Sequence, residues 1–214
     1  GSMHALPVLS LQAEREQLLE TLRAAEREMS VRFETATTDA LRAVMTMGTS
    51  ILHWSGHGEE GSIAFEDGCG ATHSLSPQLL ADTCLAGDAQ STCRMVFVCA
   101  CHSQPTAMAF VRAGVPHVVG VRSQSLVLDA AAITFTRQFY LALSVGQSVK
   151  KAFDVAQAAV CAMPPRLTAH KPAALESGKF VLLGNGDHES AVILQRPPGL
   201  LTDKTRACCV TNVP

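Results

Sequence analysis

Several features that define other classes of protein are scarce in this chain of 214 residues. Charged residues make up only 17% of it against 47% hydrophobic residues, so the composition excludes global disorder and allows a sizeable core. The formal net charge of −2 gives no electrostatic reason to expect a nucleic acid partner. No apolar run approaches the roughly 20 residues that cross a bilayer, so we expect no membrane association.

Other motifs that the chain lacks exclude further classes of function. The chain has no G-x-x-x-x-G-K loop, and the stretch "LLGNGDH" (182–188) does not supply one, which argues against a nucleotide-binding domain. The eight cysteines are too sparse for a disulfide scaffold, and several lie in apolar stretches typical of reduced thiols. With no signal peptide pattern at the start, we expect a cytoplasmic protein that needs no cofactor.

Apolar runs alternate with helical patterns along most of the chain. Strands are expected at 30–35, 50–56, 61–68, 94–100, 117–121 and 180–184. Helices are expected at about 10–27, 37–48, 76–85, 104–114, 127–143 and 146–160, and a proline-rich loop at 162–178. This alternation predicts an α/β fold in which helices cover both faces of a mainly parallel sheet.

Two reactive side chains follow two of the predicted strands. His57 comes just after the strand at 50–56, between two glycines, and Cys101 comes just after the strand at 94–100. Ligands gather at the carboxyl ends of parallel strands, so neighbouring strands would place the imidazole and the thiol at one edge. Gly58 would allow a close backbone approach to a bound carbonyl. The helix starting at about residue 104 would favour a thiolate through its positive end.

These stretches resemble the CHAT family, which comprises cysteine peptidases related to caspases and separase. The resemblance rests on "ILHWSGHG" (51–58), "VFVCACHS" (96–103), the long helical stretch at 128–157 and "FVLLGNG" (180–186). It covers about residues 8 to 190 and implies a caspase-like three-layer sandwich. It also implies an endopeptidase that acts on protein or peptide substrates through a covalent acyl-enzyme.

The resemblance further implies a role for each site residue. Cys101 would be the nucleophile and His57 the proton shuttle, and the backbone N–H groups of Gly58 and Cys101 would hold the oxyanion. Asp129 would help to shape the pocket for the P1 side chain, the residue just before the scissile bond. Substrate would pair with the segment 121–126, where Arg122, Ser123 and Gln124 replace a stretch that often contains tryptophan in the family.

Simpler interpretations compete at several positions. Asp129 could instead serve only as a first-turn residue that the helix dipole favours. Cys99 is expected to fill the core, and His53 to be a hydrogen-bonded core histidine rather than a ligand. A structural zinc site is disfavoured because the cysteines and histidines between 69 and 102 lack the tight paired spacing of such sites. A caspase-like module without catalytic activity is the alternative function.

The ends of the chain are expected to lie outside the peptidase domain. Residues 1–7, with Gly1-Ser2-Met3 resembling a cleaved tag, would form a lead-in. Residues 191–214 lose all periodicity and would form a tail, or a linker towards a signalling NTPase. The family often supplies effector modules of longer signalling proteins, so regulatory or sensor domains, in the same or a partner chain, are the expected partners.

Overall fold

The computed structural model describes residues 11–24, 29–59, 61–87, 89–195 and 205–211. Its centre is a six-stranded sheet in the order β1-β9-β2-β6-β7-β8, in which only β8 runs antiparallel to its neighbour. The bounds are β1 Met29–Thr35, β2 Ile51–Ser55, β6 Met95–Cys99, β7 His117–Val121, β8 Phe180–Leu183 and β9 Thr205–Thr211. A small antiparallel sheet projects beyond β2; its strands are β3 Gly58–Glu59, β4 Ser62–Glu66 and β5 Thr72–Leu75.

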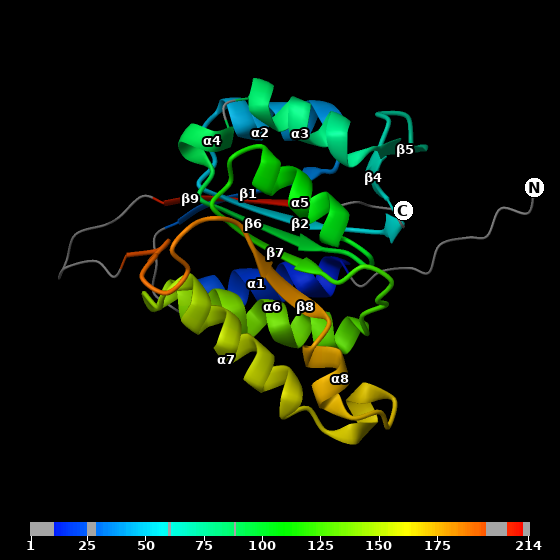
Figure 1. The fold of residues 1–214 in the computed structure, drawn as a ribbon, viewed down its shortest axis with the longest axis vertical. Helices are drawn as coiled ribbons and strands as arrows, with labels where there is room; N and C mark the ends of the chain where they lie inside the picture. The colour runs from blue at the N-terminus through cyan, green and yellow to red at the C-terminus, as the bar shows by residue number, and fades with distance from the viewer. Residues whose placement is uncertain (1–10, 25–28, 60, 88, 196–204, 212–214) are drawn as a thin grey trace, which may run out of the picture.

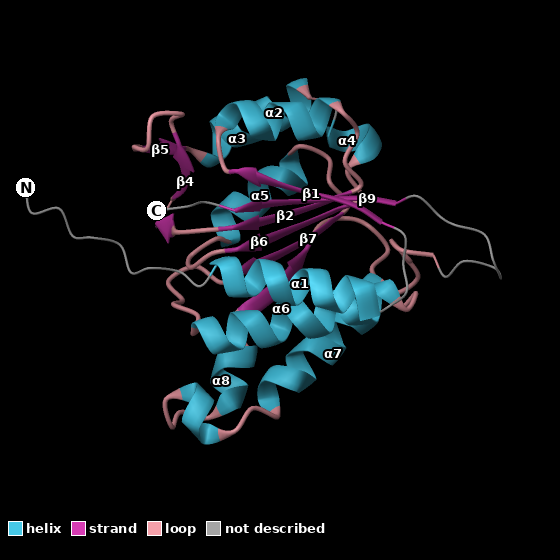
Figure 2. Cartoon of the chain, turned by 180° about the vertical axis from the view of Figure 1, so that it is seen from behind, coloured by secondary structure: helices cyan, strands magenta, loops and turns pink. Residues whose placement is uncertain are grey.

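Helices cover both faces of the central sheet (Figure 1). One face carries α2 Thr38–Thr46, α3 Pro77–Ala86, α4 Ala89–Thr92 and α5 Gln104–Arg112. The other carries α1 Leu11–Ala24, α6 Asp129–Ser144 and α7 Val149–Cys161, followed by a 3₁₀ turn Pro165–Thr168 and α8 Ala173–Ser177. Figure 2 shows α1 and α6 side by side beneath the sheet. The architecture is a caspase-like three-layer α/β sandwich, as the sequence predicts.

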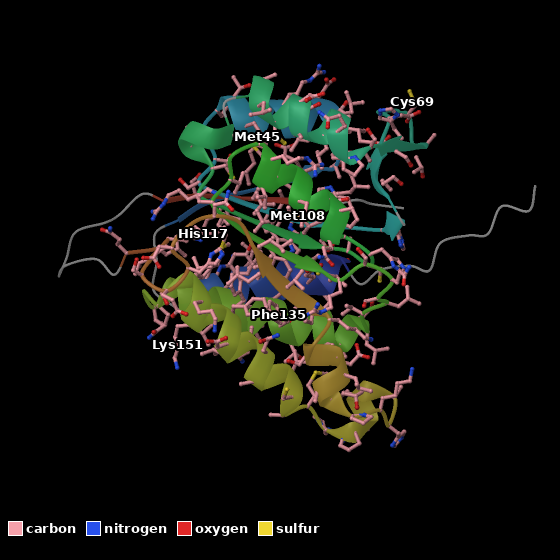
Figure 3. All side chains as sticks on the ribbon, in the orientation of Figure 1. Met45, Cys69, Met108, His117, Phe135 and Lys151 are labelled. Atoms are coloured by element: carbon pink, nitrogen blue, oxygen red, sulfur yellow. The ribbon has the colours of Figure 1, made fainter. Side chains whose placement is uncertain are left out.

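Alternation along the strands divides the core into two clusters, one on each face. Leu52, Trp54, Val96 and Val98 point towards α2, α3 and α5. Their neighbours Ile51, Met95 and Phe97 point towards α1 and α6. Figure 3 labels Phe135 in this second layer. Its ring stacks on that of Phe180 with centroids 3.9 Å apart. Such burial on both faces explains why these strands appear in the sequence as nearly continuous apolar runs.

The expected helices and strands are found within a few residues of their predicted ends. Side chains cap two of these helices: the Thr37 and Ser76 hydroxyls accept hydrogen bonds from the first turns of α2 and α3. The 61–68 stretch forms β4, which pairs antiparallel with both β3 and β5. Residues 25–27 of the first expected helix and the lead-in 1–7 lie outside the described residues.

The structure differs from the sequence expectation at two places. Residues 205–211 were expected in a tail, yet they form β9, which pairs in parallel with both β1 and β2. The loop expected at 162–178 contains the 3₁₀ turn and α8, which begins directly after Pro172. Pro172 takes the position before the first helical residue, where its missing N–H costs nothing, so the proline starts this helix rather than excluding it.

Two histidines contact each other at the amino end of β7. His117 Nδ1 lies 2.7 Å from His188 Nδ1, and Gly186 packs so closely that a Cβ there would lie 2.4 Å from the His117 ring. Burial, followed by the charge of His188, lowers the pKa of His117 to about 4. An unfolded chain protonates its histidines near pH 6.5, whereas folded His117 stays neutral down to about pH 4. Between these two pH values protons bind the unfolded chain preferentially, so the folded state loses stability as the pH falls and keeps all of it above pH 6.5.

We therefore expect the free energy of unfolding to fall as the pH drops from about 6.5 to about 4. The loss from His117 should be on the order of 1–2 kcal/mol once solvent screening is allowed for. Urea denaturation across this range should show a shallower decline for His117→Gln than for the unsubstituted chain. Parallel pH profiles for the two proteins would contradict this assignment.

Candidate active site

The strands β2 and β6 are parallel neighbours, and both end at the same edge of the sheet. Ser55 is paired with Cys99, and the Gly56 N–H donates to the Cys99 carbonyl oxygen at 3.3 Å. His57 and Cys101 each lie two residues beyond this last pair. The structure therefore brings the two residues to one edge, as the sequence predicts. In the described part of the chain, no hydrogen bond joins the imidazole to the thiol, and both residues are partly exposed.

Gly58 fixes how closely the histidine loop approaches the cysteine. A Cβ at Gly58 would lie 2.1 Å from the Cys101 carbonyl oxygen and 3.1 Å from Ala100 Cβ. No side chain fits in that space, so the glycine is required by close packing of two backbones. From Gly58 the chain enters β3, which pairs with β4 and anchors the loop to the small sheet.

Ser103 holds the segment that follows Cys101. Its buried hydroxyl donates to the Val98 carbonyl at 3.0 Å and accepts from the Val121 N–H at 2.9 Å, linking the ends of β6 and β7. The intervening His102 has a φ of 56°, the left-handed conformation that a sharp reversal requires. This reversal turns the chain from β6 into α5, and Cys101 sits at its start.

A cavity of about 60 Å³ opens beside Cys101, on the face of the sheet that α1 and α6 cover. Its walls come from five elements and the loop before α6: α1, the ends of β2, β6 and β7, and the first turns of α6. It is lined by Glu14, Ser55, Gly56, Cys99, Ala100, Cys101, Val121, Val127, Asp129, Ala132 and Ile133. The lining contains two carboxylates and no lysine or arginine.

Asp129 therefore lies at the cavity as well as in the first helical turn. Its side chain is on the exposed rim, where α6 begins. The residue that caps α6 is Leu128, whose side chain cannot accept a hydrogen bond. The pocket interpretation and the helix-dipole interpretation of Asp129 are thus compatible, because the same carboxylate lies at the cavity and in the first turn, where the helix dipole favours a negative charge.

Glu14 provides the second carboxylate, at the inner end of the cavity. Its side chain is only 11% exposed; Oε1 lies 3.2 Å from His53 Nε2, and Oε2 accepts from the Ser55 hydroxyl at 2.5 Å. Burial pushes the pKa of Glu14 up, but hydrogen bonds from His53, Ser55 and Cys99 and the charge of His53 outweigh it, so the pKa lies below the ordinary value. Glu14 is thus held as a carboxylate.

Cys99 shares this environment but differs from Cys101. Burial, and then the nearby Glu14 carboxylate, raise the pKa of the Cys99 thiol well above its ordinary value. A thiol held protonated in this way is a poor nucleophile. His53 is buried and hydrogen-bonded to Glu14 and to the Tyr140 hydroxyl, the environment that the sequence predicts for a core histidine.

Arg122, Ser123 and Gln124 do not line the cavity. Arg122 donates from its backbone to Lys179 and from Nε to Gly178, which continues the pairing of β7 with β8. The Ser123 N–H donates to the Gln104 side chain, and Gln124 has a φ of 60°. Of the four residues expected to bind substrate, only Asp129 contributes to the cavity wall.

The loop before α6 is tied down by a buried carboxylate. Glu176 in α8 is 1% exposed and accepts from the Leu128 N–H at 3.3 Å and from Lys179 Nζ at 2.5 Å. Lys179 also donates to the Leu126 carbonyl oxygen. These bonds hold the residues on both sides of Val127, and hence one wall of the cavity. No sequence pattern indicated this arrangement.

Two cavity residues were missed because their sequence signals are weak. Glu14 comes three residues after Leu11 and four before Leu18, so it falls on the apolar stripe of α1. A charged residue within an apolar stripe is the sequence feature that could have indicated this buried carboxylate. Ser55 is the last residue of an apolar strand, and nothing in the neighbouring sequence marks it as a site residue rather than an ordinary strand end.

The three-layer α/β sandwich, with a histidine and a cysteine after neighbouring parallel strands, is a caspase-like fold. The family model of the CHAT domain matches residues 2–184. The chain therefore belongs to the CHAT domain family, which is associated with peptidases of this class. A comparison with curated proteins finds no match. None of the described helices is long and apolar enough to cross a membrane.

Proposed function

We propose that this chain is a cysteine endopeptidase in which Cys101 is the nucleophile and His57 the proton shuttle. The observation that carries the proposal is the close approach of Gly58, next to His57, to the Cys101 backbone at the shared ends of β2 and β6. A nucleophile and its base must reach the same peptide bond, and this edge offers both groups to one substrate. The cavity beside Cys101 gives the substrate side chain a place to bind.

The reaction has two halves. The Cys101 thiolate attacks the scissile carbonyl, and the N–H groups of Gly58 and Cys101 stabilise the tetrahedral oxyanion. Protonated His57 gives its proton to the leaving amine as the C–N bond breaks, which leaves a thioester on Cys101. Neutral His57 then takes a proton from water, the resulting hydroxide attacks the thioester, and the thiolate departs as the acid product forms.

The cavity also favours one kind of P1 side chain. Glu14 at the inner end and Asp129 at the rim supply two negative charges, while Val121, Val127 and Ile133 supply apolar walls. Lysine and arginine combine an aliphatic stem with a terminal cation, which matches this lining in both respects. Substrates with a basic P1 residue are therefore the proposed substrate class.

A caspase-like module without catalytic activity is the competing function. An interaction platform has no need for a histidine and a cysteine at one sheet edge beside an open cavity. It also has no need for the close packing at Gly58, which holds the two loops together.

Covalent labelling separates the two functions. A peptidyl ketone electrophile with P1 arginine is expected to modify Cys101 and to spare Cys69 and Cys161, which are exposed cysteines that do not line the cavity. Mass spectrometry of the digested protein would locate the label. Labelling of Cys69 and Cys161 in preference to Cys101 would support the inactive module, because reactivity would then follow exposure alone.

The proposal includes control by other domains, so that this chain acts as the effector part of a larger signalling protein. The loop before α6 supports this view. Its position depends on a few bonds from Arg122, Glu176 and Lys179, and it forms one wall of the cavity. A partner that bears on α8 could move the loop and change access to Cys101. Residues 205–211 lie within the central sheet as β9, so the prediction that residues 191–214 lead towards such a partner does not extend to them.

A further inference from the structure

Three potential metal ligands meet below the cavity, and the proposed reaction uses none of them as an acid, base or nucleophile. They are Glu14 from α1, His53 from β2 and Cys99 from β6. One ligand atom from each lies within 4.8 Å of the other two. Together they offer one oxygen, one nitrogen and one sulfur atom. Among common metal ions, a thiolate with an imidazole selects Zn²⁺ over Ca²⁺ or Mg²⁺.

Neighbouring groups already orient two of the ligands. The Tyr140 hydroxyl lies 3.1 Å from His53 Nδ1, which leaves Nε2 directed at Glu14. Ser55 donates to Glu14 Oε2, which leaves Oε1 directed at His53. Partners of this kind fix ring and carboxylate orientation in protein metal sites. The ring of His53 is also held edge-on against Phe97, with centroids 4.9 Å apart.

The spacing of Glu14 and His53 suits a tetrahedral ion. Zinc bonds to nitrogen and oxygen of about 2.0–2.1 Å place two ligands of a tetrahedron about 3.3 Å apart. Glu14 Oε1 and His53 Nε2 are 3.2 Å apart, so a zinc ion could replace the hydrogen bond between them with little movement of either group. Both Glu14 and Cys99 line the cavity, which provides a route of entry.

We propose that Glu14, His53 and Cys99 form a zinc site through Oε1, Nε2 and Sγ. Water occupies the fourth position, on the cavity side. The Cys99 thiol loses its proton to solvent when the ion binds, because the thiolate is the ligand. This set differs from the cysteines and histidines between residues 69 and 102 whose spacing argued against structural zinc, since two of its members lie outside that span.

Zinc at this site would act as an inhibitor, a consequence that rests on the proposed function. With the Glu14 carboxylate and the Cys99 thiolate as ligands, the charges of the zinc site sum to zero at the inner end of the P1 cavity. A lysine or arginine side chain then loses the attraction that the free Glu14 carboxylate would otherwise provide. The peptidase would therefore cleave such substrates faster when free zinc is scarce.

Binding is tested first, without any measurement of activity. Co²⁺ is added to the Cys101→Ala variant, which removes the nucleophile as a competing ligand. We expect one equivalent to bind with a thiolate-to-cobalt charge-transfer band in the near ultraviolet, and Zn²⁺ to displace it. Ca²⁺ and Mg²⁺ should not displace the bound Co²⁺.

Further substitutions on the same background identify the ligands. Cys99→Ser should abolish the charge-transfer band, and Glu14→Gln and His53→Gln should each weaken Zn²⁺ binding by about tenfold or more. Cys93→Ser is the matched control, because Cys93 is a buried cysteine outside the cluster. A band that survives Cys99→Ser, binding that requires Cys101, or no binding at all would overturn the site. Thermal melts would show that each variant is folded.

Inhibition is tested separately with a P1 arginine peptide. The concentration of Zn²⁺ that halves the rate should rise by about tenfold or more in Cys99→Ser relative to the unsubstituted chain, whatever the rate without zinc. An equal concentration in both proteins would refute the inhibitory role. A chain that binds Co²⁺ through Cys99 but cleaves no peptide would refute the proposed function and leave the metal site standing.

Discussion

Cys101→Ala is expected to lower kcat/KM for a peptide with P1 arginine by roughly four orders of magnitude or more. Alanine cannot form the thioester, and the neighbouring cysteine at this edge cannot take over the reaction. Cys99, two residues earlier, faces α1 and holds its proton because of burial and Glu14. Initial rates measured by mass spectrometry of the cleaved peptide would give the ratio of the two constants.

The matched control is Cys161→Ala, which removes an exposed cysteine at the end of α7. Its kcat/KM should equal that of the unsubstituted chain. His57→Ala provides a second comparison and should lose about 10²–10⁴-fold, because the thiol remains while proton transfer is lost. Unchanged cleavage by Cys101→Ala would reject Cys101 as the nucleophile.

The edge that carries His57 and Cys101 could be predicted because it depends on local patterns. The apolar runs before them mark two buried strands, and Gly56 and Gly58 mark a tight exit from the first. Parallel strands that neighbour each other bring their carboxyl ends together, and the register of Ser55 with Cys99 does so here.

Features that depend on distant pairing were not predictable in the same way. Strand β9 lies between β1 and β2, which are more than a hundred residues earlier in the chain. No local pattern specifies that insertion, and the prolines and glycine at 197–199 suggested a linker instead. Glu14 reached the cavity for a similar reason, since the helix that carries it packs beneath strands that come much later.

Basic P1 selectivity is the second large effect that the site predicts. The double variant Glu14→Gln with Asp129→Asn should lower kcat/KM for P1 arginine by about 100-fold, at about tenfold for each charge removed. The glutamine oxygen can accept from one of the partners His53 and Ser55, and its NH2 group can donate to the other, since a hydroxyl and a neutral imidazole both accept; the cavity should therefore keep its shape. Matched peptides with P1 arginine, leucine and glutamate would be compared at one ionic strength.

Selectivity, rather than rate alone, distinguishes recognition of charge from general damage. Cleavage of the P1 leucine peptide should change little in the double variant, because the apolar walls of the cavity remain. The control is Asp39→Asn with Asp82→Asn, which removes two exposed charges from α2 and α3 on the opposite face of the sheet. An equal loss of kcat/KM for the P1 arginine and P1 leucine peptides would mean that the two carboxylates maintain the shape of the site but do not recognise the charge of the substrate. A preference for P1 glutamate in the unsubstituted chain would place the P1 side chain outside this cavity altogether, because two carboxylates at its ends repel an anion.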